Sequence, residues 1–369
     1  MNGEAVNSNS NSKPEGDGRL VRNELDKLFR RGLVWKVLLG IFVLVGASEL
    51  YLNSYYFYGG HYGELQEEMA LHEKYRGRLT DGRLDDFLQE RWGSFHQKYP
   101  EESYNYMDAY YDGDGNELNI DGGGISVGDV FSGVHFPIEF GYFEGWSLFL
   151  DQLPRYVKYL PIFIAVAFSA LFSYERQCGM EEMLLCAKRG RRDCARAKVA
   201  GAFLVTNALC GAVVLLPSLI AFFLYQGNGL GTSIQMTPWL RDTQLEMDYG
   251  TLYLHMIILS FLAVNVVLLI ALTAAFLARS PMTALCVTLG VLYLMRPDLI
   301  SGYFPIDGVK KLTALTPVNV VDAMNLAKQV PVAVGGVKLH WLAVAEVMYS
   351  SLLVGGGLFF FRMLGRRFV

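Results

Sequence analysis

An acidic stretch, DGDGNELNIDGG from Asp112 to Gly123, has the residue types that bind a hard cation. Asp112, Asp114 and Asn116 alternate like the first ligands of an EF-hand calcium loop. That loop requires glycine where this chain has Glu117, and a bidentate glutamate where it has Gly123. The pattern therefore favours a solvated turn over a calcium site.

A second candidate for chemistry is the adjacent pair Glu181 and Glu182, which lies close to a predicted membrane span. The pair resembles that of CAAX-type intramembrane proteases, but those enzymes place an arginine four residues beyond it, where this chain has Cys186. No FxxxH or HxxxN pattern follows in the later apolar runs to supply metal ligands. An intramembrane hydrolase is therefore disfavoured.

Other patterns that would carry chemistry are absent from the sequence. It has no GxxxxGK[ST] phosphate loop, no GxSxG nucleophile elbow and no HExxH zinc helix. Cys178, Cys186 and Cys194 do not have CxxC spacing and have no histidine near them, so they are expected to be inert thiols. The six histidines are widely scattered. We therefore expect no catalytic residues, no metal site, no cofactor bound by this chain and no enzymatic activity of its own.

The elements that must position the charged segments are membrane helices. The chain has 369 residues and is 52% hydrophobic, and its apolar residues form blocks of about the length that crosses a bilayer. The sequence predicts a mainly α, polytopic fold with six transmembrane helices, at 33–57, 156–174, 199–225, 252–277, 282–299 and 341–361. The first run is too long for a signal-peptide core and lacks a cleavage pattern, so we expect it to be retained.

The distribution of Lys and Arg predicts the orientation in a cell (plasma) membrane. Basic residues are concentrated in the N-terminal segment, in 175–198, after the fourth span and in the tail 362–369. All four positions fall on one side of a six-span arrangement, so both termini are predicted to be cytoplasmic. The opposite side receives 58–155, which has no cysteine and so no disulfides, and the loop 300–340.

The remaining segments differ in composition. Residues 1–18 are polar and predict a disordered cytoplasmic tail, whereas 19–32 has one apolar face and predicts an amphipathic interface helix; an ordinary basic stretch that only sets topology is the alternative. The insertion 58–155 is predicted to be an α+β extracytoplasmic domain. Its first part places Leu84, Phe87 and Leu88 at helical spacing, and its second part is rich in Gly, Asp and Tyr.

The segment from Glu175 to Lys198 resembles the intracellular segment of permease subunits in the type-2 ABC exporter superfamily. That segment usually has an acidic-basic pair, a glycine, an acid, a leucine run, and then an arginine and a lysine. This chain supplies Glu175, Arg176, Gly179, Glu182, Leu184, Leu185, Arg191 and Lys198 in that order. It departs from the pattern at 186–190, where the family often has a Ser-Thr-Pro-like stretch.

The resemblance implies that 175–198 is a cytoplasmic coupling segment that docks into a separate ABC ATPase subunit, where ATP and Mg bind. It further implies a second permease, either a copy of this chain or a related one, and no nucleic-acid partner. Charged groups set register and specificity at such a contact. The residues expected to take part in ATPase coupling are Glu175, Arg176, Gly179, Glu181, Glu182, Lys188, Arg191, Arg192 and Lys198.

Three alternatives remain open. The chain could be a non-transporting membrane sensor or immunity protein whose outer domain binds a peptide or envelope component. It could be an ATP-independent carrier, although such carriers usually have clearer polar breaks near the middle of their spans. The segment 175–198 could also be a solvated basic loop that only obeys the positive-inside rule. Glu49, His255 and Glu346 are ionisable groups in or beside apolar runs, and such residues usually face a bundle interior or a wet cavity. Glu49 and Glu346 lie toward the outer ends of their runs, where we expect their side chains to reach water.

Overall fold

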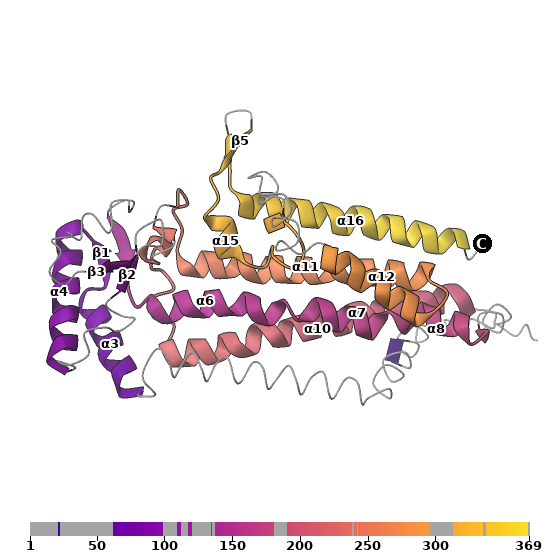
Figure 1. The fold of residues 1–369 in the computed structure, drawn as a ribbon, viewed down its shortest axis with the longest axis horizontal. Helices are drawn as coiled ribbons and strands as arrows, with labels where there is room; N and C mark the ends of the chain where they lie inside the picture. Colours follow the sequence, from indigo (N-terminus) through magenta and orange to yellow (C-terminus); the bar gives the residue numbers. More distant parts are fainter. Residues whose placement is uncertain are drawn as a thin grey trace, which may run out of the picture.

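The structure is a computed structural model that describes residues 21–22, 62–98, 109–111, 117–119, 134, 137–180, 190–237, 240–241, 243–294, 313–334 and 337–367. Long helices run side by side along one axis, and a smaller part containing α3 and α4 lies at one end of them (Figure 1). The principal long helices are α10 (Gly190–Tyr225), α11 (Tyr249–Leu277), α12 (Pro281–Leu294) and α16 (Trp341–Arg367). The expectation of a mainly helical membrane protein is confirmed.

Four helical stretches in the described part of the chain are long and apolar enough to cross a membrane. They are Glu144–Gln177, Asp193–Tyr225, Tyr249–Leu277 and Trp341–Arg366. Helix α12 is apolar but shorter, with 14 residues. The predicted first span, 33–57, and the predicted interface helix, apart from the helical residues 21–22, lie outside the described residues.

The first of these stretches is a run of three consecutive helices. They are α6 (Glu144–Val157), α7 (Leu160–Phe168) and α8 (Ala170–Gln177). Pro154 lies inside α6 and Pro161 lies in the first turn of α7, and neither proline has a backbone N–H to donate. At the junction, the Lys158 N–H donates to the Pro154 carbonyl oxygen at 3.0 Å and the Tyr159 N–H to the Tyr156 carbonyl oxygen at 3.3 Å. The helical run extends beyond the predicted span 156–174 at both ends.

Helix α11 is at the centre of the bundle. It packs against α7, α8, α10, α12 and α16. One face repeats a small or apolar residue at every fourth position, and each of these residues is at most 1% exposed: Leu259, Ala263, Val267, Ala271 and Ala275. Small residues let neighbouring helices approach closely, which is how membrane helices gain packing energy without a hydrophobic driving force between them.

Helices α10 and α16 present apolar side chains to the outside of the bundle. Phe223 on α10 is 78% exposed and Leu358 on α16 is 68% exposed. Large apolar patches of this kind are unfavourable in water but are compatible with lipid tails. This exposure agrees with a membrane-embedded chain.

The part at the α3 end of Figure 1 contains α3 (Tyr62–Lys74), α4 (Asp81–Lys98) and short antiparallel strand pairs. Strand β1 (Gly77–Leu79) pairs with β4 (Ile138–Phe140), and β2 (Ala109–Tyr111) pairs with β3 (Glu117–Asn119). Leu84 and Phe87 are fully buried and Leu88 is 8% exposed, as their helical spacing predicts. Most of the acidic stretch 112–123 lies outside the described residues.

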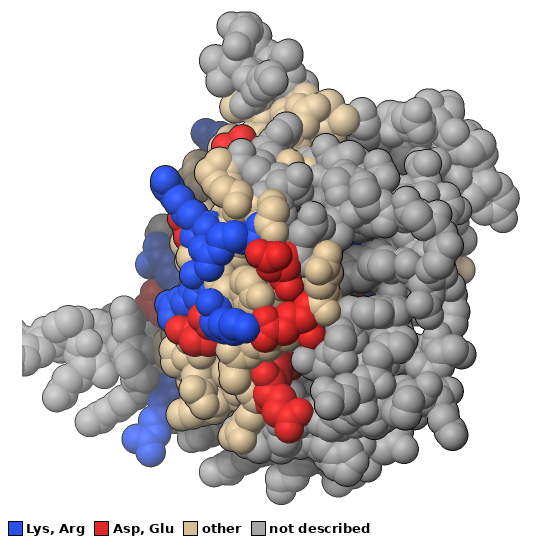
Figure 2. Space-filling model, turned by 90° about the vertical axis from the view of Figure 1, so that its left-hand side faces the viewer, with Lys and Arg blue, Asp and Glu red and all other residues tan. Residues whose placement is uncertain are grey.

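Charges of both signs are mixed on the face of this part shown in Figure 2. Exposed ion pairs join Lys74 to Glu90, Arg76 to Glu73 and Arg78 to Glu139. On the described part of this face, residues of opposite charge therefore lie beside one another.

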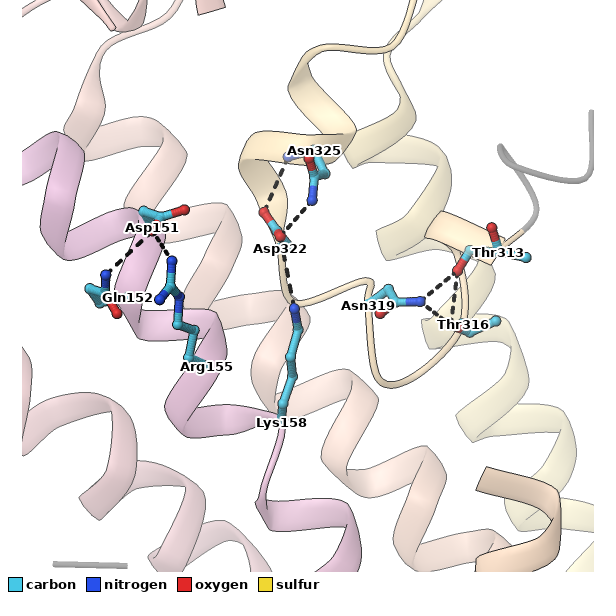
Figure 3. A network of polar contacts seen from close by, with 9 residues as sticks. All are labelled: Asp151, Gln152, Arg155, Lys158, Thr313, Thr316, Asn319, Asp322 and Asn325. Carbon is cyan, nitrogen blue, oxygen red and sulfur yellow. Dashed lines mark hydrogen bonds and ion pairs between the residues drawn. The ribbon is translucent and has the colours of Figure 1, made fainter. Parts of the chain in front are cut away.

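A polar network joins α6 to the short helix α15 (Ala323–Ala327), as Figure 3 shows. Asp322 caps α15 by accepting a hydrogen bond from the backbone N–H of Asn325, and its other oxygen accepts one from the Asn325 amide at 2.6 Å. The Lys158 ammonium, between α6 and α7, lies 4.0 Å from the Asp322 carboxylate. This contact attaches the segment before α16 to the junction between α6 and α7. The same segment also contains β5 (Val332–Val334) and β6 (Val337–Leu339).

Candidate functional site

The predicted coupling segment begins on α8, and Arg176 there binds the end of a different helix. Its guanidinium donates hydrogen bonds to the carbonyl oxygens of Phe276 at 2.9 Å and Ala278 at 2.7 Å, with a longer one to Leu277 at 3.4 Å. The last carbonyls of a helix have no partner within it, and they carry the negative end of its dipole. The planar, multiply donating guanidinium suits this position, so Arg176 attaches α8 to the C-terminus of α11.

Glu175, the neighbouring residue, forms an ion pair with Lys198 on α10. The Lys198 side chain is only 3% exposed, whereas that of Glu175 is 24% exposed. The Lys198 ammonium also lies 5.7 Å from the centre of the Phe172 ring, within the range of a cation–π contact. A charge this deeply buried needs a partner, so the pair holds α8 against α10.

The backbone conformation at position 179 explains why this residue is a glycine. Its φ is +67°, in the left-handed region, and it directly follows Cys178, which caps α8. The Gly179 N–H donates to the carbonyl oxygen of Arg176 at 3.2 Å. A left-handed residue just after a helix is the common way to end it, and glycine adopts that conformation without steric cost.

The structure therefore brings together four of the nine predicted coupling residues, Glu175, Arg176, Gly179 and Lys198, and gives each a role in anchoring or ending a helix. Arg191 and Arg192 lie in the first turn of α10. Glu181, Glu182 and Lys188 lie outside the described residues. Glu175 and Lys198 join the two ends of the segment, and Arg176 joins it to α11, at the end of the bundle where α8 and the C-terminus lie (Figure 1).

A shallow cavity of about 360 Å³ lies beside this junction, between α11 and α16. It is lined by Phe276, Leu277, Phe359, Arg362, Met363 and Arg366. Two of these residues, Phe276 and Leu277, also supply carbonyl oxygens to Arg176. The junction thus has an apolar hollow with two arginines at its margin.

Two ionisable residues inside the spans are paired with each other. His255 on α11 and Glu346 on α16 are joined by a 2.6 Å hydrogen bond between Nδ1 and a carboxylate oxygen, and each side chain is about one quarter exposed. The expectation that Glu346 reaches water at the end of its span does not include this pairing. Pairing is the usual arrangement for ionisable groups in a membrane, and nothing in the sequence indicates it because 91 residues separate the two.

An amide pair joins α10 to α11. Asn207 and Asn265 exchange two hydrogen bonds, of 3.1 and 2.9 Å, and each amide also donates to a carbonyl of its own helix. Amide side chains commonly bridge helices in this way in membranes. The pair fixes the register of the two helices but offers no group suited to catalysis.

Comparisons of the chain with protein-family models, with curated proteins and with solved structures find no match. The functional interpretation therefore depends on the residues and geometry described above.

Proposed function

We propose that this chain is the permease subunit of an ABC exporter, forming the transmembrane export pathway in a plasma membrane. A separate nucleotide-binding subunit hydrolyses ATP, and two permease chains assemble with two such subunits. In this proposal both termini and the segment 175–198 face the cytoplasm.

The observation that supports this proposal is the attachment of the segment at both of its ends. Arg176 binds the C-terminal carbonyls of α11, and Glu175 pairs with the buried Lys198 of α10. Because α11 packs against seven other helices of the described part, a displacement applied between these anchors would be carried into the bundle. A loop that only set the topology would need basic residues but no such anchoring.

The anchoring residues and the contacting residues then have separate roles. Glu175, Arg176, Gly179 and Lys198 hold the segment, which leaves Glu181, Glu182, Lys188, Arg191 and Arg192 to contact the ATPase. Charged groups at such a contact determine register and partner choice more than overall affinity. Charge reversal within the second set should therefore release the partner without unfolding the chain.

The test is to tag the chain in its native host, purify it in mild detergent and identify the proteins that co-purify. We expect a protein with a phosphate-binding loop to be recovered with the unmodified chain and lost with a variant in which Glu182→Lys and Arg191→Glu are combined. Asp151→Asn, a change at an exposed ion pair of α6, is the matched control and should retain the partner.

Recovery of no ATPase, under conditions in which a known ABC complex survives, would refute the proposal. That result would favour the sensor or immunity alternative, in which the part of the chain containing α3 and α4 binds the ligand. Equal recovery with the charge-reversed variant would retain the transporter interpretation but remove the assigned contact.

A further inference from the structure

Four charged or titratable side chains meet where α3, α4 and α6 join. Glu68 and His72 lie one turn apart on α3, Arg91 comes from α4, and Glu144 is the first residue of α6. One potential ligand atom from each of Glu68, His72 and Glu144 lies within 4.8 Å of the other two; for His72 this is one of its two ring nitrogens, and Nδ1 lies 3.7 Å from Oε1 of Glu68. The cluster is at the opposite end of the bundle from the predicted coupling segment (Figure 1).

His72 is completely buried, and one of its ring nitrogens has no partner. Its Nδ1 lies 2.8 Å from the backbone carbonyl oxygen of Glu68, so this nitrogen carries the proton and donates it. Its Nε2 therefore has a free lone pair, buried and without a hydrogen bond. A histidine that donates one N–H to a backbone carbonyl and offers the other nitrogen has the arrangement of a metal ligand.

The surroundings keep the His72 imidazole neutral. The rings of Phe87, Phe140, Tyr142 and Phe143 pack around it, with centroids 4.8 to 5.6 Å away. The pKa of His72 is lowered to about 4, chiefly by burial; the Arg91 charge acts in the same direction, and Glu68 acts against it. Neutral imidazole is the form that binds metal ions.

One carboxyl oxygen of Glu144 leaves a ligand position open. Arg91 contacts Oε1 of Glu68 through Nε at 2.7 Å, and it also contacts Oε1 of Glu144. The other oxygen of Glu144, Oε2, is buried and has no hydrogen-bond partner. A buried polar atom without a partner is unfavourable, so this oxygen offers an open position for a bound cation.

We propose that Glu68, His72 and Glu144 bind one divalent transition-metal ion, Zn²⁺ in the first instance. One nitrogen and two oxygens suit such an ion better than Ca²⁺ or Mg²⁺, which prefer oxygen ligands alone. A water molecule completes the coordination. Arg91 holds the carboxylates from outside, as hydrogen-bond donors around metal sites commonly do.

To bind Zn²⁺, the ligand atoms of this cluster must move slightly closer together. Zinc bonds of about 2.1 Å in a tetrahedron place ligand atoms about 3.4 Å apart. The present limit of 4.8 Å means that side chains must close by roughly 1 Å, which rotation of a glutamate side chain can supply. The side chains of Glu68, Arg91 and Glu144 are 10 to 15% exposed, so the ion has a route of access from solvent. Bound metal would fasten α3 to the start of α6.

The test uses the full chain in detergent, stripped with a chelator and dialysed against Zn²⁺ or Co²⁺. We expect one Zn²⁺ per chain by elemental mass spectrometry, and visible absorption bands from Co²⁺ in the same site. His72→Phe keeps an aromatic ring in the same packing and Glu144→Gln keeps the side-chain shape, and each removes one ligand. Both should weaken Zn²⁺ binding at least about 100-fold, because even the loss of a group outside the ligands costs 10- to 100-fold.

Glu73→Gln is the matched control, because Glu73 neighbours His72 on α3 but is 54% exposed and paired with Arg76. It should bind Zn²⁺ like the unmodified chain. The proposal is overturned if the unmodified chain shows neither stoichiometric Zn²⁺ nor Co²⁺ absorption, which would leave His72 as an aromatic-packed core residue. It is also overturned if His72→Phe and Glu144→Gln retain the ion, which would place it elsewhere, for example at His255 and Glu346. If His72→Phe does not fold, Glu144→Gln and the spectrum of the unmodified chain decide the question.

Discussion

The ion pair between Glu175 and Lys198 gives the sharpest test of how α8, α10 and α11 are held together. Glu175→Gln removes the carboxylate and leaves the Lys198 ammonium, 3% exposed, without a counter-charge. Breaking a buried ion pair by removing one partner costs about 3 to 5 kcal/mol. The Glu175 side chain is 24% exposed, and this partial access to water places the expected loss in the free energy of unfolding near the lower end, about 3 kcal/mol.

The assay is a double-mutant cycle on the purified chain in a single detergent, measured by denaturant unfolding. Lys198→Met should cost less than Glu175→Gln, because the carboxylate that remains can reach water more easily than the ammonium. The double variant, with neither charge, should be more stable than the sum of the single losses predicts, by about 1 to 3 kcal/mol. Replacing both members of a buried pair by neutral groups is often nearly neutral in stability.

The control pair is Asp151 and Arg155 on α6, whose atoms are 2.7 Å apart and whose side chains are 39% and 55% exposed. Asp151→Asn should cost no more than about 0.5 kcal/mol, the usual value of an exposed pair one helical turn apart. If Glu175→Gln costs no more than this control, or if the cycle shows simple additivity, the buried pair does not hold α8 against α10 and the reasoning is refuted.

Three further predictions concern packing, a helix contact and a cap. Gly229→Ala should prevent normal folding, because φ is +86° and a Cβ would lie 1.5 Å from the carbonyl oxygen of Tyr142; monodispersity on gel filtration checks this. Leucine at either Asn207 or Asn265 should cost about 0.6 kcal/mol, the mean for such hydrogen bonds in membranes, measured by unfolding in detergent. Asp322→Asn should keep the α15 cap, since asparagine caps as well as aspartate, whereas Asp322→Ala should cost about 1 kcal/mol.

The Gly229 prediction has a control variant, and the Asn207 and Asn265 prediction has a double variant that tests it. Gly231→Ala is the control for Gly229, because a Cβ at Gly231 would meet no atom within 4 Å; equal behaviour of the two variants would contradict the packing argument. A double leucine variant less stable than the sum of the single losses would contradict the amide pairing.

For Asp322, burial raises the pKa of the carboxyl above its ordinary value, with smaller opposing effects from Asn325 and Lys158. The folded state therefore binds the proton more tightly than the unfolded state, so this group favours folding as pH falls below the folded pKa. The stabilisation is lost as pH rises through that pKa. The free energy of unfolding of Asp322→Asn, relative to that of the unmodified chain, should therefore be larger at neutral pH than in acid.

The membrane helices could be predicted from the sequence because apolar runs of the right length have few other uses. The ends of these helices could not be predicted as well. The run Glu144–Gln177 begins before the predicted 156–174 because α6 carries charged residues such as Asp151 and Arg155, which lower the local hydropathy while the helix continues. Length and composition show which part of a chain is apolar. A helix can continue beyond that part, so its ends cannot be predicted in this way.

The contacts of the candidate site could not be predicted from the sequence. Glu175, Arg176 and Lys198 stand out by type and spacing, yet the partners of Arg176 are backbone carbonyl oxygens about 100 residues away, which no side-chain pattern reports. The same holds for the cluster at the other end. Glu68 and His72 have the spacing of one helical turn, a signal present in the sequence, whereas only the fold brings Glu144 to them.

The helical run Glu144–Gln177 joins the two ends of this molecule. Its 34 residues span about 50 Å at 1.5 Å per residue. Glu144, in the charged cluster, is its first residue, and Glu175 and Arg176 are in its last turn. The charged cluster and the α8 junction are therefore carried on one continuous stretch of chain, with the proline-bounded junction beside Lys158 and Asp322 between them.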